Sequence, residues 1–139
     1  MADVMQVRTV TLEAARRAVT ACVERAEELG VEAAIAVVDQ AGNLKAFARM
    51  DGAPLLSSRI AQDKAWTAAA FGIPTHAWWD LVKDEPPLLH GIVMSDRLIV
   101  FGGGVPLRSG GEVVGGIGVS GGSADQDREI AEAGAAVIS

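Results

Sequence analysis

The sequence predicts an α+β fold, in which helices pack on an antiparallel sheet. Two kinds of segment support this prediction: stretches with apolar residues every three or four positions, and short β-rich runs joined by tight turns. In addition, no predicted strand is joined to a parallel neighbour by a clear crossover helix, which favours an antiparallel sheet. The predicted order is αββααβββα, and the 139 residues, 1–139, are expected to form a single domain.

The first predicted helix covers residues 11–29. Thr11 suits its N-cap, and Gly30 suits the left-handed residue that commonly follows a helix. Its apolar positions recur at spacings of three and four, which places them on one stripe: Leu12, Ala15, Val19, Cys22, Ala26 and Leu29. Since Cys22 lies on this stripe, we interpret it as a small buried hydrophobe.

A β-hairpin and two helices are predicted next. Residues 33–39 and 44–50 read as strands on either side of the turn D-Q-A-G-N. The second helix is expected to begin at a Ser57 or Ser58 cap and to end near Phe71. A short helix through H-A-W-W-D-L-V follows, and K-D-E-P-P-L-L-H-G reads as a loop.

The last part of the chain is predicted to be mostly β-structure. Strands are expected over residues 97–103, 105–109 and 112–121, which brings the sheet to five strands. Ser123 and Gln126 then fit a capping box that opens a final helix.

Composition and charge exclude several classes of function. The formal net charge is −6, and no basic stripe is present, so we expect neither nucleic acid nor a membrane surface as a partner. A single cysteine rules out an internal disulfide and favours a reducing, cytoplasmic location. The start of the chain does not resemble a secretory signal, and the apolar runs are too short to span a bilayer.

Glycines are concentrated near the end of the chain. Gly116 to Gly121 fits G-x-G-x-x-G, but only 18 residues follow, which leaves no room for the acidic residue of a dinucleotide site. No nicotinamide cofactor is therefore expected. Ten of the sixteen glycines lie in residues 102–122. Three explanations stay open: close packing of helices on the sheet, room for a flat ligand or a second subunit, and an anion near a helix start.

Several motifs in one order resemble the GlcG/HbpS family, which includes the C-terminal domain of PduO-type proteins. The motifs are V-D-x-x-G-x-L at 38–44, D-G-A at 51–53, D-K-A-x-T-A at 63–68, and G-G-x-P followed by G-x-V-V-G-x-I-G-V-S-G-G. The resemblance implies a profilin-like fold with a five-stranded antiparallel sheet flanked by helices. It also implies a homo-oligomer, either a dimer or a larger assembly. Some members of the family bind haem, and some of these sense redox conditions.

Haem is therefore the ligand that the resemblance favours, in a haem carrier or redox sensor. The expected pocket is bounded by the Asp51 loop, the helix with Lys64 and Thr67, and the turn with Gly102, Gly103 and Gly104. A haem needs an apolar slot and an axial ligand. The candidate ligands in this sequence are His76, His90, Met50 and Met94, with Thr67 as a weaker one. Covalent attachment is excluded, because C-x-x-C-H is absent.

A small enzyme of carboxylic-acid or aromatic catabolism is the second hypothesis. In it, Lys64 would position a carboxylate and either Asp51 or His90 would move a proton. Two histidines in unrelated segments give no signal of a metal site.

A non-catalytic, self-associating subunit is the third hypothesis. The three tryptophans, Trp66, Trp78 and Trp79, favour apolar burial, at a subunit contact or in a groove between helix and sheet.

Overall fold

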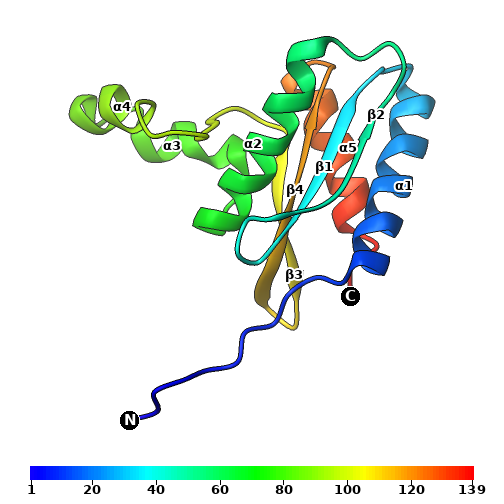
Figure 1. The fold of residues 1–139 in the computed structure, drawn as a ribbon. Coiled ribbons are helices and arrows are strands. Elements are labelled where there is room, and N and C mark those ends of the chain that lie inside the picture. The colour runs from blue at the N-terminus through cyan, green and yellow to red at the C-terminus, as the bar shows by residue number, and fades with distance from the viewer.

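The computed structural model describes residues 1–139 as one four-stranded sheet with helices on both of its faces (Figure 1). The elements in chain order are α1 (Leu12–Leu29), β1 (Ala34–Asp39), β2 (Leu44–Arg49), α2 (Leu55–Phe71), a 3-10 turn η1 (Thr75–Ala77), α3 (Trp78–Val82), α4 (Pro86–Ile92), β3 (Gly104–Ser109), β4 (Glu112–Ser120) and α5 (Ala124–Ala135).

The sheet is antiparallel throughout, with the strand order β2-β1-β4-β3. The α+β class is therefore confirmed, but the prediction of five strands was wrong. The segment 97–103, expected to be a strand, is irregular. Arg97, the first residue of this segment, adopts a left-handed backbone with φ of 67°, so a strand cannot begin there. The Thr67 hydroxyl also accepts the N–H of Ile99 at 3.1 Å and lies 2.9 Å from the carbonyl of Arg97. Backbone groups that a ladder would use are thus bound by α2.

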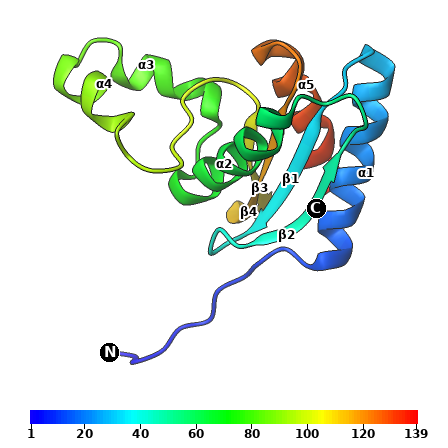
Figure 2. The ribbon, with the colours of Figure 1, turned by 45° about the horizontal axis from the view of Figure 1, so that its top comes forward.

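Three layers make up the molecule (Figures 1 and 2). Helix α2 covers one face of the sheet, and α1 and α5 cover the other. Because side chains alternate along a strand, β1 supplies both faces. Ile35 and Val37 belong to the core under α1 and α5, whereas Ala34 and Ala36 belong to a smaller cluster under α2.

Small residues allow α2 to approach the sheet closely. A Cβ on Gly116 would collide with the carbonyl of Ala65, and one on Gly118 would collide with that of Ala61. Both glycines lie on β4, and alanines face them from α2. Close helix packing is therefore the explanation that the structure supports for these glycines of the G-x-G-x-x-G stretch.

The predicted caps of the first and last helices are present. The Thr11 side chain accepts the N–H of Ala14 at 3.1 Å, and Gly30 is left-handed with φ of 69°. Ser123 and Gln126 form both bonds of the capping box. These signals are local in sequence, which is why the sequence could reveal them.

Two predicted boundaries in the middle of the chain were wrong. Helix α2 begins at Leu55, directly after Pro54, without a side-chain cap from either serine. The expected loop over residues 83–91 contains helix α4, which starts at Pro86. Proline is well tolerated there, since the first N–H groups of a helix have no partner inside it.

Helices α3 and α4 project away from the three layers in both views (Figures 1 and 2). We call residues 78–94 the arm. Trp78 anchors its base, since it is buried and its ring centroid lies 4.6 Å from that of Phe71. Beyond Trp78 the arm exposes large apolar side chains, namely Trp79, Leu81, Leu88, Val93 and Met94. No helix has the length and apolar character needed to cross a membrane.

Candidate functional site

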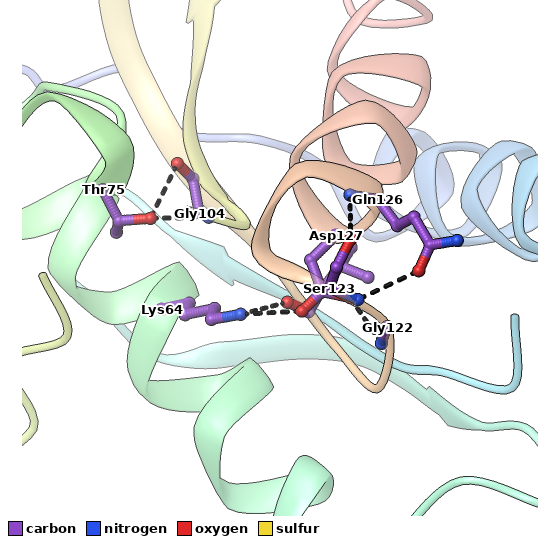
Figure 3. Close-up of polar contacts among 8 residues, drawn as sticks. Lys64, Thr75, Gly104, Gly122, Ser123, Gln126 and Asp127 are labelled. Carbon is purple, nitrogen blue, oxygen red and sulfur yellow. Dashed lines mark hydrogen bonds and ion pairs between the residues drawn. The ribbon is translucent and has the colours of Figure 1, made fainter. Parts of the chain in front are cut away.

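Lys64 is fully buried between α2, β4 and α5 (Figure 3). Its Nζ donates to the carbonyl of Val119 at 2.8 Å and to Asp127 Oδ2 at 3.1 Å, and it lies 5.1 Å from the centroid of the Phe101 ring. Asp127 Oδ1 in turn accepts the N–H of Gly122 at 2.8 Å. Burial lowers the pKa of Lys64 and raises the pKa of Asp127, and each charge partly offsets the shift of the other. The pair joins three elements through groups that cannot reach solvent.

The glycine turn fills the space beside Lys64. A Cβ on Gly103 would lie 2.7 Å from Lys64 Nζ, and one on Gly104 would lie 2.6 Å from the Lys64 carbonyl. Thr75 Oγ1 accepts the N–H of Gly104 at 2.8 Å, as Figure 3 shows. A Cβ on Gly102 would lie 3.1 Å from the carbonyl of Ala124. This turn therefore packs directly against α2, η1 and α5.

His76 is half-buried beside α5. Its Nδ1 is buried without a hydrogen-bond partner. Burial lowers the pKa of His76, and the nearby Arg128 lowers it further. Glu132 partly opposes this shift of the pKa, and the net effect favours the neutral imidazole more than in an exposed histidine.

The other predicted site residues are dispersed. Asp51 is exposed in the turn after β2, and His90 is exposed on α4. No hydrogen bond or ion pair joins either of them to Lys64 or to each other. Their predicted catalytic roles stay predictions, as do the cofactor roles of Thr67, His76 and the three glycines. None of these residues lines a cavity.

The largest cavity is a cleft of about 660 Å³ between the N-terminal half of α2 and the chain that returns from the arm. We call it the α2 cleft. Its lining combines two leucines, two arginines, two aspartates and two neutral polar side chains, namely Leu55, Leu56, Ser58, Arg59, Gln62, Asp63, Asp96 and Arg97. Leu55 and Leu56 are 87% and 66% exposed.

Asp63 organises the two guanidinium groups of the α2 cleft. Its side chain is only 13% exposed. Arg97 Nε donates to Asp63 Oδ1 at 3.1 Å, and Arg59 Nε lies 3.5 Å from Asp63 Oδ2. The Arg97 guanidinium also lies over Trp66, 5.1 Å from its ring centroid. The terminal Nη groups of both arginines make no hydrogen bond inside the protein.

The sequence motifs include Asp63 of the α2 cleft but not Arg97. Asp63 belongs to the motif D-K-A-x-T-A, whereas Arg97 lies in no motif. Arg97 meets Asp63 across 34 positions of the chain. It is also the only non-glycine residue with a positive φ, and no local pattern in the sequence indicated that conformation.

Comparison with known proteins shows relatives over nearly the whole chain. The chain is 39% identical over 129 residues to an uncharacterized 15.0 kDa protein in the dhaT-dhaS intergenic region of Citrobacter freundii, covering 91% of this chain and 90% of that protein. It is 40% identical over 120 residues to the corrinoid adenosyltransferase PduO of Salmonella typhimurium. That match covers 85% of this chain but only 35% of PduO.

The fold is also similar to solved structures. A crystal structure of a PduOC:heme complex superposes with a TM-score of 0.85 at 37% identity, covering 94% of this chain and 95% of that one. Residues 10–136 match the model of the family described as haem degrading protein HbpS-like, so the chain belongs to the HbpS-like family, as its motifs predicted.

Proposed function

We propose that this protein binds haem, and that the α2 cleft holds it. The observation that carries the proposal is the combination in one cleft of an apolar rim with two guanidinium groups whose Nη atoms are free. Membership of the HbpS-like family and the similarity to a PduOC:heme complex support haem as the ligand.

The lining residues fit the periphery of a haem. The porphyrin ring is flat and apolar, and Leu55 and Leu56 offer exposed apolar surface that contact with a ring would remove from water. The two propionates are carboxylates, which guanidinium groups bind in a bidentate manner. Arg97 and Arg59 would therefore orient the ring by its acidic edge.

The lining residues include no usual ligand for the haem iron. None of the eight is histidine, cysteine, methionine or tyrosine, the side chains that usually ligate haem iron. Bound haem would supply an iron centre whose redox behaviour depends on its axial ligands. The chain's own residues in the cleft would bind and orient the ring. A carrier or a redox sensor is the role that we propose, and the exposed rim favours the carrier, since the ring could leave without unfolding the protein.

A haemin titration followed by the Soret band tests this proposal. We expect saturation in the full chain and a Kd about tenfold weaker or more in Arg97→Ala, because a charged hydrogen bond contributes about 1.5–3 kcal/mol. Arg17→Ala, an exposed arginine change on α1, is the matched control and should bind like the wild type. His76→Ala and His90→Ala test the two histidines among the candidate axial ligands through a shift of the band. A spectrum indistinguishable from haemin with an unrelated acidic protein would exclude haem binding.

We also propose that the protein forms a homo-oligomer. The support is the arm, which projects from the body of the molecule (Figure 1) and carries large exposed apolar side chains. Surfaces of this kind commonly mark contacts with other proteins.

A further inference from the structure

We infer that the α2 cleft recognises the carboxylates and the apolar ring of its ligand rather than a bound metal ion. Its ligand class would then be flat, apolar molecules with acidic substituents, whether or not they carry iron. This inference rests on the proposed function and specifies what the same cleft recognises.

The donor set of the cleft favours carboxylates over iron. The lining offers no nitrogen or sulfur ligand, since the arginines stay protonated and cannot donate an electron pair. Asp63 is the only largely buried carboxylate of the cleft, and each of its two oxygens already faces one arginine, at 3.1 Å and 3.5 Å. Iron would have either to displace the ion pairs of Asp63 or to take the single exposed carboxylate of Asp96, whereas a ligand carboxylate would meet free N–H groups on two arginines.

Arg97 is held ready for such a carboxylate. Its Nε is fixed on Asp63, its guanidinium rests on the ring of Trp66, and its carbonyl is 2.9 Å from the hydroxyl of Thr67. Its backbone is left-handed, a conformation that is unfavourable for arginine and persists only where surrounding contacts such as these hold it. Because the side chain is already ordered, less conformational entropy is lost when a ligand binds. Asp63 acts as the positioning residue, since it touches Arg97 rather than the ligand.

The charges of the cleft favour recognition at short range. The lining contains two arginines, Arg59 and Arg97, and two aspartates, Asp63 and Asp96, so its four formal charges cancel. The cleft therefore exerts little net attraction at a distance on an acidic ligand. The paired geometry of a guanidinium and a carboxylate, rather than the overall field, would select the ligand.

Three tetrapyrroles separate the parts of this inference. Haemin has iron and two carboxylates, protoporphyrin IX has the carboxylates alone, and protoporphyrin IX dimethyl ester has neither. Binding to the full chain is read from quenching of tryptophan fluorescence, since Trp66 lies beneath Arg97. We expect the Kd values of haemin and protoporphyrin IX to agree within about threefold, and the ester to bind about tenfold more weakly or worse.

Variants locate the effect at Arg97. Arg97→Ala should remove most of the difference between acid and ester, and Arg97→Lys should restore only part of it, because an ammonium group cannot form the bidentate pair. Asp63→Asn should weaken binding of the acid more than that of the ester. Arg17→Ala on α1 is the matched control and should preserve the full difference. The ratio of the two Kd values is measured on one variant at a time. A general loss of folded protein affects both ligands alike and leaves this ratio unchanged.

Each contrary result has a distinct meaning. If haemin binds and protoporphyrin IX does not, iron ligation governs binding; the inference then fails while haem binding stands. If the ester binds as well as the acid, or if Arg97→Ala leaves their difference intact, recognition of carboxylates by Arg97 is wrong. If no tetrapyrrole binds, both the inference and the proposed function fail.

Discussion

At the scale of single residues, the buried pair of Lys64 and Asp127 dominates the interior. The pair links α2 with β4 and α5 through contacts of 2.8 Å and 3.1 Å. Taking two charges out of water is costly, and their mutual attraction offsets this cost only while both partners are present. The pair therefore constrains how the three elements fit together, whatever its net contribution to stability.

Removal of one partner tests this view of the pair. Lys64→Met leaves a buried carboxylate without its cation, so we expect the free energy of unfolding to fall by about 3–5 kcal/mol. The double variant Lys64→Met/Asp127→Leu removes both charges and should recover much of that loss. Urea denaturation gives the free energy of unfolding of the wild type, the single variant and the double variant. A single variant that costs less than about 1 kcal/mol would show that the pair is not needed.

We expect His76 to make the free energy of unfolding depend on pH. Burial and then Arg128 lower its pKa below the ordinary value of 6.5. The unfolded chain therefore binds a proton more readily than the folded one, and stability falls as the pH drops from 6.5 through the folded pKa. Thermal unfolding measured over this pH range should show that the Tm depends less steeply on pH in His76→Asn than in the wild type. His90→Asn, which removes the other, exposed histidine, should retain the slope; if both variants or neither flatten it, His76 is not its source.

At the scale of elements, the contact between α2 and β4 depends on small residues. Gly116 and Gly118 on the strand face Ala61, Ala65 and the backbone of the helix. The helix backbone cannot move aside as a flexible side chain could. The spacing of these two layers is therefore set by the absence of side chains on the strand.

Restoring one methyl group tests the layer spacing. In Gly118→Ala the added methyl group would collide with the carbonyl of Ala61. We expect the free energy of unfolding, measured by urea denaturation, to fall by about 1–3 kcal/mol, the usual cost of an overpacked core, or by more. Gly91→Ala is the matched control. Gly91 lies in α4 with open space around it, so alanine there should be neutral or stabilise by about 0.5–1 kcal/mol. Equal effects of the two changes would contradict the packing argument.

At the scale of the whole molecule, the arm stands apart from the three-layer body (Figure 2). Its only large buried anchors are Trp78 and Val82 near its base. The α2 cleft lies where the chain returns from the arm, through Asp96 and Arg97. The proposed ligand site and the proposed contact surface are thus neighbours in the chain.

Assembly of the protein is tested by sedimentation velocity. We expect the wild type to sediment as a species larger than its 14.4 kDa chain. Leu81→Glu places a charge on the exposed arm and should shift the protein toward the monomer. Leu12→Glu, at an exposed position of α1 on the other face of the sheet, should not. A monomeric wild type, or an equal effect of the control, would refute assembly through the arm.

What the sequence by itself determined was the local structure and the family. The stripe of α1, the hairpin of β1 and β2, and the capping box at Ser123 depend on residues close together in the chain, so their patterns could be read directly. The ordered motifs gave the HbpS-like family. The cleft residue Asp63 was also marked, as part of a motif.

Only the tertiary structure decided the rest, because it depended on contacts between distant residues. The apolar run at 97–103 has the composition of a strand, but the sheet has only four strands. Thr67 on α2 binds the backbone of this run, and the left-handed conformation of Arg97 prevents a strand from beginning there. Lys64 faces a carboxylate 63 positions away. The α2 cleft joins Asp63 to Arg97 across 34 positions. Pairings at such separations leave no periodic trace in the sequence, and folding alone brings them together.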